Sequence, residues 1–229
     1  MRAAFADPHA PCLTTHSPPS TQLALLQAES LTCLRDEEAL FVPIDIDLAP
    51  GHLLVLEGRN GAGKTTLLRA LLGLHPLTAK SLHFRGTDVL RERHALCSGA
   101  LWLGHLLALK GDLTVRENLR YNLAIGDEDA AEDVDELCAN LGIAGYEDTP
   151  TRSLSAGQRK RAALARLAAS RRPLWLLDEP FANLDGPGMA VVERLLATHL
   201  ARGGSAMLTS HGVLPITLPA TTVRLEHAR

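Results

Sequence analysis

The stretch Gly58-Arg59-Asn60-Gly61-Ala62-Gly63-Lys64-Thr65-Thr66 decides the fold of this chain. It matches G-x-x-x-x-G-K-[ST], a loop whose glycines let backbone N–H groups wrap phosphate oxygens. The continuously apolar run Leu53–Leu56 comes just before it, as expected of a strand buried on both faces, and Lys64–Gly73 is predicted to be the helix after it. Strand, loop and helix therefore stand in the order that a phosphate-binding loop requires.

The loop also supplies side chains for nucleotide chemistry. Lys64 is expected to neutralise the β- and γ-phosphates of ATP, and Thr65 to ligate Mg²⁺. The helix that begins here points its positive end at the same anion. Nine residues are candidate binding residues: Gly58, Arg59, Asn60, Gly61, Ala62, Gly63, Lys64, Thr65 and Thr66.

A second apolar run, Leu174–Leu177, ends in two carboxylates, Asp178 and Glu179. Asp178 suits coordination of Mg²⁺ through water. Glu179 is then placed to polarise the attacking water, which is the general-base task of hydrolysis. Two acids that merely end a strand are the alternative, but the phosphate-binding loop favours catalysis.

The segment Leu154-Ser155-Ala156-Gly157-Gln158 precedes a basic, Ala/Leu-rich helix that is predicted to run to about Arg171. Ser155 is a natural N-cap, and the small residues after it would let the backbone approach an anion at a positive helix end. Alone, this is only a capped helix start. Its position between the loop and the Asp178-Glu179 pair makes the combination specific.

Composition limits the function classes. The chain has 229 residues, 46% hydrophobic and 21% charged, which suits one sizeable α/β domain or two small ones. A formal net charge of −3 gives no electrostatic reason to expect nucleic acid as a partner. The four cysteines form no Cys-x-x-Cys pair, which favours the cytoplasm over a disulfide framework or a metal site.

The sequence predicts neither a membrane-spanning segment nor an N-terminal secretory signal. The uncharged, largely apolar stretch Ala95–Leu109 falls short of the about 20 apolar residues that a spanning helix needs, so no direct membrane insertion is expected. Residues 1–21 are rich in Pro, Ser, Thr and His and lack a secretory pattern. We predict that they form a disordered extension, and that residues 22–229 form the folded domain.

The remaining pattern is mixed. Strands are predicted over Leu23–Glu29, Leu40–Leu48 and His52–Glu57, and the alternation in Ile44–Leu48 suits an antiparallel strand. From about 88 to 155 the character is helical, and this range is predicted to be an inserted helical subdomain. One of its helices is predicted to begin at a capping box at Thr114 and to run through Ala124. A second, acidic helix is predicted over Asp127–Leu141. Two further elements are predicted, a helix over Pro187–Arg202 and a strand over Ala206–Thr209.

At this point the sequence resembles the nucleotide-binding subunit of ABC transporters over nearly all of residues 23–227. The motifs of that family appear in order: the phosphate loop, the signature Leu154–Gln158, the Asp178-Glu179 strand, the D-loop Asn183-Leu184-Asp185 and the switch histidine His211. The resemblance implies a P-loop NTPase of the ABC ATPase type, with an antiparallel β subdomain and an inserted helical subdomain.

The resemblance also implies a head-to-tail dimer. ATP would lie between the Lys64 loop of one chain and the Ser155 turn of the other, where Gly157 and Gln158 would also contact it. Asp185 would lie at the dimer contact, and His211 would contact the γ-phosphate.

Two positions depart from the family pattern. His105 stands where a glutamine that touches Mg²⁺ and the attacking water is expected, and it is a poorer partner for Mg²⁺. Arg35 stands near the place of the aromatic residue that stacks on adenine, and a guanidinium can also stack on a base. Neither departure removes Lys64, Asp178 or Glu179.

Finer resemblance favours one branch, the haem exporter ATPase of cytochrome c maturation. It rests on Leu103-Gly104-His105, on Ser155–Arg161 and on Trp175–Asp185. That branch implies membrane permease subunits as partners and a peripheral location on the cytoplasmic side of the inner membrane. The alternatives are a soluble non-transport ABC ATPase, such as a regulator of iron–sulfur assembly, and the ATPase of another small-molecule exporter. A binding module with a dead site and a P-loop small-molecule kinase fit the motifs less well.

Overall fold

The computed structural model describes residues 24–125, 133–210, 214 and 216–228. Three sequence predictions lie wholly or partly outside these residues: the extension over 1–21, the part of the acidic helix predicted over 127–132, and the switch histidine His211. None of the helices in the described part of the chain has the length and apolar character that a bilayer crossing requires.

A five-stranded parallel sheet forms the centre of the molecule, in the order β11-β4-β10-β9-β8. The strands are β4 (Leu53–Glu57), β8 (Ala100–Leu103), β9 (Leu174–Leu177), β10 (Ser205–Thr209) and β11 (Thr221–Arg224). Every residue of β9 and β10 is buried, which explains why β9 and the middle of β10 (Ala206–Leu208) are continuously apolar rather than alternating.

The parallel register brings the carboxyl ends of four strands together. Leu103 of β8 is opposite Leu177 of β9, and Leu177 is opposite Leu208 of β10. On the other side of β10, Thr209 is opposite Leu56 of β4. The residues that follow β4, β8 and β9 therefore emerge at one edge of the sheet, which is where open α/β sheets bind ligands.

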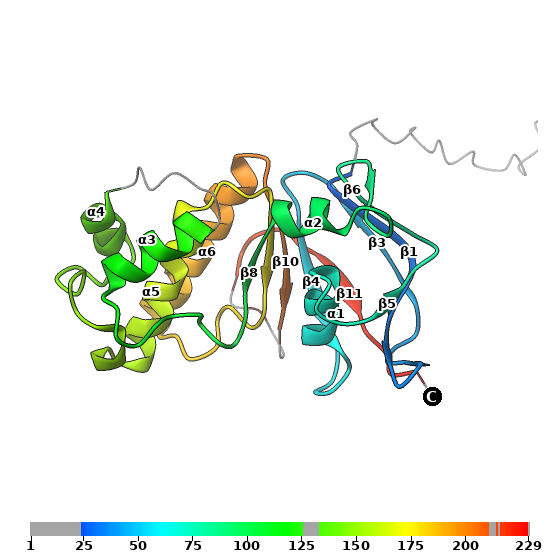
Figure 1. The fold of residues 1–229 in the computed structure, drawn as a ribbon, viewed down its shortest axis with the longest axis horizontal. Coiled ribbons are helices and arrows are strands. Elements are labelled where there is room, and N and C mark those ends of the chain that lie inside the picture. Colours follow the sequence, from blue (N-terminus) through cyan, green and yellow to red (C-terminus); the bar gives the residue numbers. More distant parts are fainter. Residues whose placement is uncertain (1–23, 126–132, 211–213, 215, 229) are drawn as a thin grey trace, which may run out of the picture.

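A second, antiparallel sheet packs beside the first (Figure 1). Its long central strand β1 (Leu26–Arg35) pairs with β2 (Glu38–Ala39), β3 (Ile44–Leu48), β5 (Leu77–Thr78) and β6 (Ser81–Phe84), and β6 pairs with β7 (Thr87–Asp88). The predicted antiparallel β subdomain is confirmed.

Helices cover both faces of the parallel sheet. On one side lie α3 (Val115–Ile125), α4 (Val134–Asn140), α5 (Ala156–Ala169) and α6 (Gly186–Ala201), and on the other lie α1 (Lys64–Leu71), α2 (Arg93–Gly99) and the antiparallel sheet (Figure 1). Successive residues of β4 alternate between the two cores: Leu53 and Val55 face α5 and α6, whereas Leu54 and Leu56 face α1.

Several predicted boundaries differ from the structure. The first strand runs over Leu26–Arg35 rather than Leu23–Glu29. The predicted strand Leu40–Leu48 keeps only its second half as β3, beginning just after Pro43, which has no N–H to donate to a ladder. Within the described residues, the acidic helix runs over Val134–Asn140, and the Asp133 side chain caps it by accepting from the N–H groups of Asp135 and Glu136.

The range 88–155 is not helical throughout. It includes β8 (Ala100–Leu103), which is the edge strand of the parallel sheet. It also includes the helix α2, whose Leu96 packs in the core with the antiparallel sheet. The helices of the insert, α3 and α4, lie beyond Leu103. Between them and α5, Thr151–Ser153 forms one 3₁₀ turn.

Candidate functional site

The phosphate loop joins β4 to α1 and depends on glycine at two positions. Gly63 caps α1 with a φ of +97°, and a Cβ there would lie 2.9 Å from the Phe41 ring. Gly58 has a φ of +153°, and a Cβ there would lie 2.9 Å from the carbonyl oxygen of Leu225. Both the backbone conformation and the close neighbours therefore exclude side chains.

Lys64 folds back over this loop. Its Nζ donates to the carbonyl oxygen of Gly58 at 2.6 Å and to that of Arg59 at 3.3 Å, and only 6% of the residue is exposed. Burial lowers the pKa of the Lys64 ammonium, and the carboxylates of Glu179 and Asp178 act in the opposite direction. The cation is therefore held at the centre of the loop, next to the carboxylates after β9.

Asp178 is the buried acceptor between two strands and α1. Its Oδ1 accepts from the hydroxyl of Thr65 at 2.9 Å and from that of Thr209 at 2.8 Å, and the residue is 4% exposed. The N–H of Asp178 donates to the Leu103 carbonyl at 2.8 Å, which ties β9 to the end of β8. Thr65 and Asp178, predicted to share a metal ion, are thus in direct contact.

Glu179 follows Asp178 in a left-handed backbone conformation, with a φ of +50°. Its N–H donates to the Thr209 hydroxyl at 2.9 Å, and its carbonyl oxygen accepts from the N–H of Ala182 at 3.1 Å. The Nζ of Lys160 reaches the same carbonyl at 3.3 Å. The main chain is therefore held from several sides, so Glu179 occupies one defined place at the sheet edge.

Ser155 is the N-cap of α5 as predicted, and with Gln158 it forms a full capping box. The Gln158 N–H donates to the Ser155 hydroxyl at 3.2 Å, and the Ser155 N–H donates to the Gln158 side chain at 2.9 Å. Ser155 and Ala156 are exposed, and a Cβ on Gly157 would meet nothing within 4 Å. The first turn of α5 therefore presents small residues and a positive helix end to the outside.

Asp185 has two roles within its own chain. Its Oδ1 accepts from the Gly188 N–H at 2.9 Å, so it caps α6, and its carboxylate pairs with Arg161 at 3.0 Å. The side chain is still 56% exposed. It can therefore also face a second molecule.

The two positions that depart from the family pattern lie in different surroundings. His105 is exposed two residues beyond β8, the strand that ends beside Asp178. Arg35 is exposed at the end of β1, opposite Glu38. The ring that does contact the loop, Phe41 against Gly63, was not singled out from the sequence.

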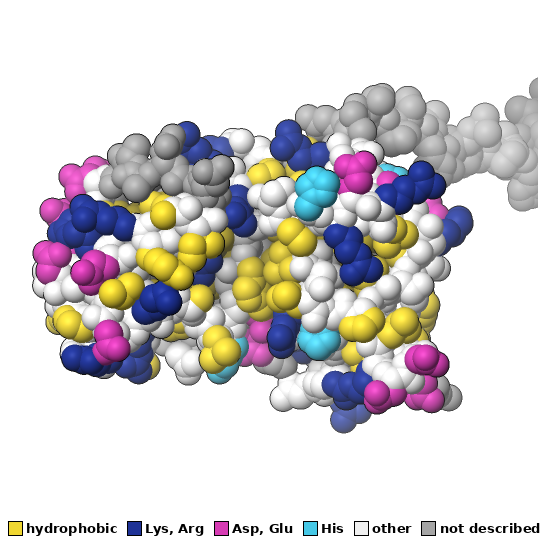
Figure 2. All heavy atoms as spheres, viewed as in Figure 1, with side chains coloured by type: hydrophobic (Ala, Val, Ile, Leu, Met, Phe, Trp, Pro, Cys, Tyr) yellow, Lys and Arg dark blue, Asp and Glu magenta, His cyan; other side chains and the backbone are white. Residues whose placement is uncertain are grey.

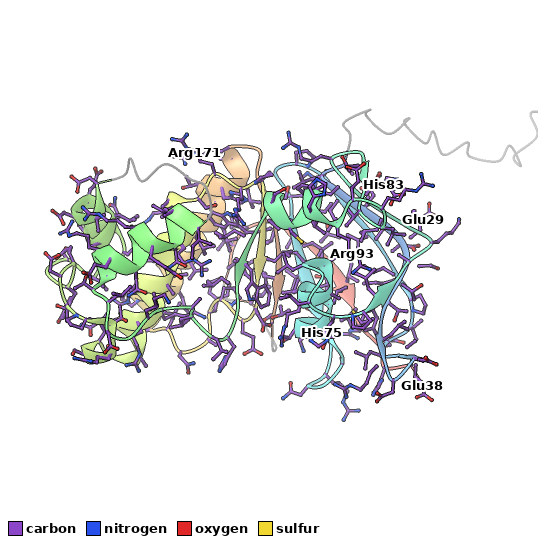
Figure 3. The ribbon with its side chains drawn as sticks, viewed as in Figure 1. Glu29, Glu38, His75, His83, Arg93 and Arg171 are labelled. Carbon is purple, nitrogen blue, oxygen red and sulfur yellow. The ribbon has the colours of Figure 1, made fainter. Side chains whose placement is uncertain are left out.

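A pocket of about 950 Å³ opens beside the loop. Its lining includes Gly58, Arg59, Asn60, Ala62 and Ser210. A second hollow of about 980 Å³ is lined by Arg171, Pro173 and His199, which lie at the amino end of β9, away from Asp178. Figure 3 shows Arg171 near the end of α6, and the chemistry described above does not involve it.

The parallel sheet is covered by helices on both faces, and Lys64, Asp178 and Glu179 meet at the carboxyl ends of its strands. This combination defines a P-loop nucleotide-binding domain. The family model for ABC transporters matches residues 41–182 of this chain. The chain therefore belongs to the ABC transporter family, and it is an ABC-type ATPase.

Curated relatives agree with this assignment. The chain is 45% identical over 194 residues to a cytochrome c biogenesis ATP-binding export protein, CcmA, from Methylococcus capsulatus, covering 84% of this chain and 94% of that protein. It is 43% identical over 202 residues to the protein of the same name from Dechloromonas aromatica, covering 87% and 98%.

Solved structures agree in fold. The ATP-binding subunit of an ABC transporter superimposes with a TM-score of 0.72 at 20% identity, over 82% of this chain and 80% of that one. An ABC transporter ATP-binding protein from Pyrococcus furiosus gives a TM-score of 0.75 at 17% identity, over 87% and 96%.

Proposed function

We propose that this chain is the ATP-hydrolysing subunit of a membrane exporter that serves c-type cytochrome biogenesis, with haem as the exported group. The observation that carries ATP hydrolysis is the contact of Thr65 with Asp178, beside Lys64 and Glu179, at one sheet edge. The export role is supported by the relatives named for it, which align over most of their own length.

The residues divide the chemistry among them. Backbone N–H groups of the loop and the Lys64 ammonium hold the β- and γ-phosphates. Glu179 accepts a proton from the water whose oxygen attacks the γ-phosphorus, while the bond to the bridging oxygen of ADP breaks. His211 is proposed to contact the γ-phosphate, His105 to hydrogen-bond the attacking water, and Arg35 to stack on the base.

Magnesium fits the donors that the structure brings together. Thr65 Oγ1 and Asp178 Oδ1 lie 2.9 Å apart, and hydroxyl and carboxylate oxygens are the ligands that Mg²⁺ prefers. Thr65 would bind the ion directly and Asp178 through water. When bound, Mg²⁺ would neutralise charge on the phosphate oxygens.

The partners follow from the exposed half-site. Ser155, Gly157 and Gln158 are proposed to contact ATP held by the Lys64 loop of a second copy, with Asp185 at the contact between the two chains. Permease subunits in the inner membrane are proposed as further partners, with this chain bound peripherally on the cytoplasmic side. Co-purification from membranes, followed by identification of the integral subunits, tests this arrangement; isolation without any such subunit would contradict it.

The central test is Glu179→Gln. Because the amide cannot accept the proton of the attacking water, kcat for ATP hydrolysis is expected to fall by about 100-fold or more while ATP binding persists. The matched control is Glu29→Gln, at an exposed residue of β1 that Figure 3 labels. Its carboxylate pairs with Lys80 at 2.9 Å, away from the site. Equal activity of the two variants would contradict the catalytic role.

The export role has its own test. In cells that lack the native protein, the wild-type chain is expected to restore haem-stained c-type cytochromes, and Glu179→Gln is expected not to. Restoration by Glu179→Gln, or normal cytochromes without the protein, would contradict the role while leaving the ATPase assignment intact.

A further inference from the structure

Lys160 is a buried cation, and the phosphate chemistry described above assigns it no role. It lies in the second turn of α5 and is 6% exposed. A buried ammonium is unfavourable unless it is paired and hydrogen-bonded. Its Nζ donates to the carbonyl oxygen of Glu179 at 3.3 Å. Burial lowers the pKa of Lys160, and the carboxylates of Asp178 and Glu179 oppose that change.

The contact reaches a backbone that needs support. Glu179 has a φ of +50°, a conformation that non-glycine residues keep only where their surroundings hold them. The Thr209 hydroxyl holds its N–H from β10, and the Ala182 N–H holds its carbonyl from the same turn. Lys160 adds a third hydrogen bond to the Glu179 backbone, donated from α5.

Arg161, the next residue of α5, holds the other end of the same turn. Its Nη2 donates to both carboxylate oxygens of Asp185, at 3.0 and 3.1 Å, and its Nη1 donates to the Gly142 carbonyl at 3.2 Å. The side chain is 19% exposed, and its buried Nε has no hydrogen-bond partner in the structure. Its orientation is therefore explained by Asp185 and Gly142.

We propose that Lys160 and Arg161 are positioning residues that fix the two ends of the segment 179–185, and thereby tie Glu179 to the helix whose first turn carries Ser155. The proposal rests on the assignment of Glu179 as the water-activating residue. Since Ser155 is proposed to contact ATP of the second copy, α5 joins the occupancy of one site to the alignment of Glu179 in the other.

The first test is Lys160→Met in the full-length protein. Because the methionine stem fills the space without donating, kcat for ATP hydrolysis is expected to fall about tenfold, with KM for ATP within about twofold. Lys160→Arg keeps a charged donor and is expected to restore most of kcat. The matched control is Lys80→Met, in which the lysine side chain is 77% exposed.

The second test is Arg161→Gln, which is expected to lower kcat in the same way, with Arg91→Gln as its control on a side chain that is 87% exposed. A kcat within about twofold of wild type in both α5 variants would overturn the proposal, since a lost charge-assisted hydrogen bond changes more. Equal losses in Lys160→Arg and Lys160→Met, together with a lowered Tm, would also overturn it.

Two controls keep the outcome readable. If Lys160→Met does not fold, Lys160→Gln, which is neutral and one bond shorter, is measured against the same criteria. If the Glu179→Gln variant hydrolyses ATP as fast as the wild type, the assignment of Glu179 as the water-activating residue is overturned instead, whatever the α5 variants do.

Discussion

Thr209 connects both acidic residues of the site through one hydroxyl. It donates to Asp178 Oδ1 at 2.8 Å, accepts from the Glu179 N–H at 2.9 Å, and is 1% exposed. This residue was predicted only as the last position of a strand. Its role depends on which strand lies beside β9, and that is not a local property of the sequence.

Replacement of Thr209 by valine removes the hydroxyl and keeps the shape. The partly buried Glu179 N–H then lacks its acceptor and Asp178 loses one donor, so the free energy of unfolding is expected to fall by about 1–3 kcal/mol. Urea unfolding followed by circular dichroism measures it. Thr222→Val, on the exposed strand β11, should change little, and an equal effect of the two substitutions would contradict the assigned role of the hydroxyl.

Two helices of the molecule begin with the same device, a capping box. Ser155 and Gln158 form it on α5, and Thr114 and Glu117 form it on α3, where the hydroxyl accepts at 3.1 Å and the carboxylate at 2.9 Å. The two boxes provide an internal comparison, since only the one on α5 is proposed to contact nucleotide.

Ser155→Ala and Thr114→Ala are each expected to lower the free energy of unfolding by about 1 kcal/mol, the usual contribution of an N-cap. ATP hydrolysis is expected to fall only in Ser155→Ala. Thermal unfolding and an ATPase assay on both variants separate the two effects. Parallel losses of activity would mean that Ser155 acts through helix stability alone.

Local signals explain which elements could be predicted. The phosphate loop, the end of β9 and the start of α5 depend on residue types at fixed spacings, and all three were predicted in place. By contrast, Ala100–Leu103 is a four-residue apolar run that periodicity cannot distinguish from a buried helix. It is a strand because it pairs with β9. The exposed pattern of β11 likewise gave no signal.

The same contrast holds in the site. Lys64, Asp178 and Glu179 were predicted because motif spacing specifies them, and the structure places them together. Lys160 and Phe41 were not, because the sequence does not show that α5 passes behind Glu179 or that a ring packs on Gly63. His211 stays a prediction, since it lies outside the described residues.

At the scale of the whole molecule, charge is mixed rather than segregated: Figure 2 shows Lys and Arg interspersed with Asp and Glu over the face in view. The arrangement that matters is instead that one chain presents two different half-sites, the Lys64 loop and the exposed Ser155 turn. Mixing two inactive variants tests whether those halves belong to different chains.

Lys64→Ala removes the loop cation, and Ser155→Arg blocks the α5 turn, so each variant alone is expected to lack ATPase activity. In a head-to-tail dimer of the two, one composite site combines an intact loop with an intact turn, and activity should reappear on mixing. Its amount should follow the fraction of mixed dimers, measured with differently tagged chains. No recovery, with mixed dimers present, would mean that each site is complete within one chain.

Residues 225–227, which lie far along the chain from the phosphate loop, pack against the loop and its neighbours. Leu225 lies against Gly58, the Val42 N–H donates to the Glu226 carbonyl at 2.8 Å, and the His227 ring contacts the Leu40 carbonyl at 2.7 Å. During synthesis, β4 and its loop emerge long before β11, the strand that pairs beside β4 and leads into these residues. The nucleotide site therefore gains this support only after residues 225–227 have been synthesised, so a nascent chain cannot complete its ATP-binding surface when the loop first emerges.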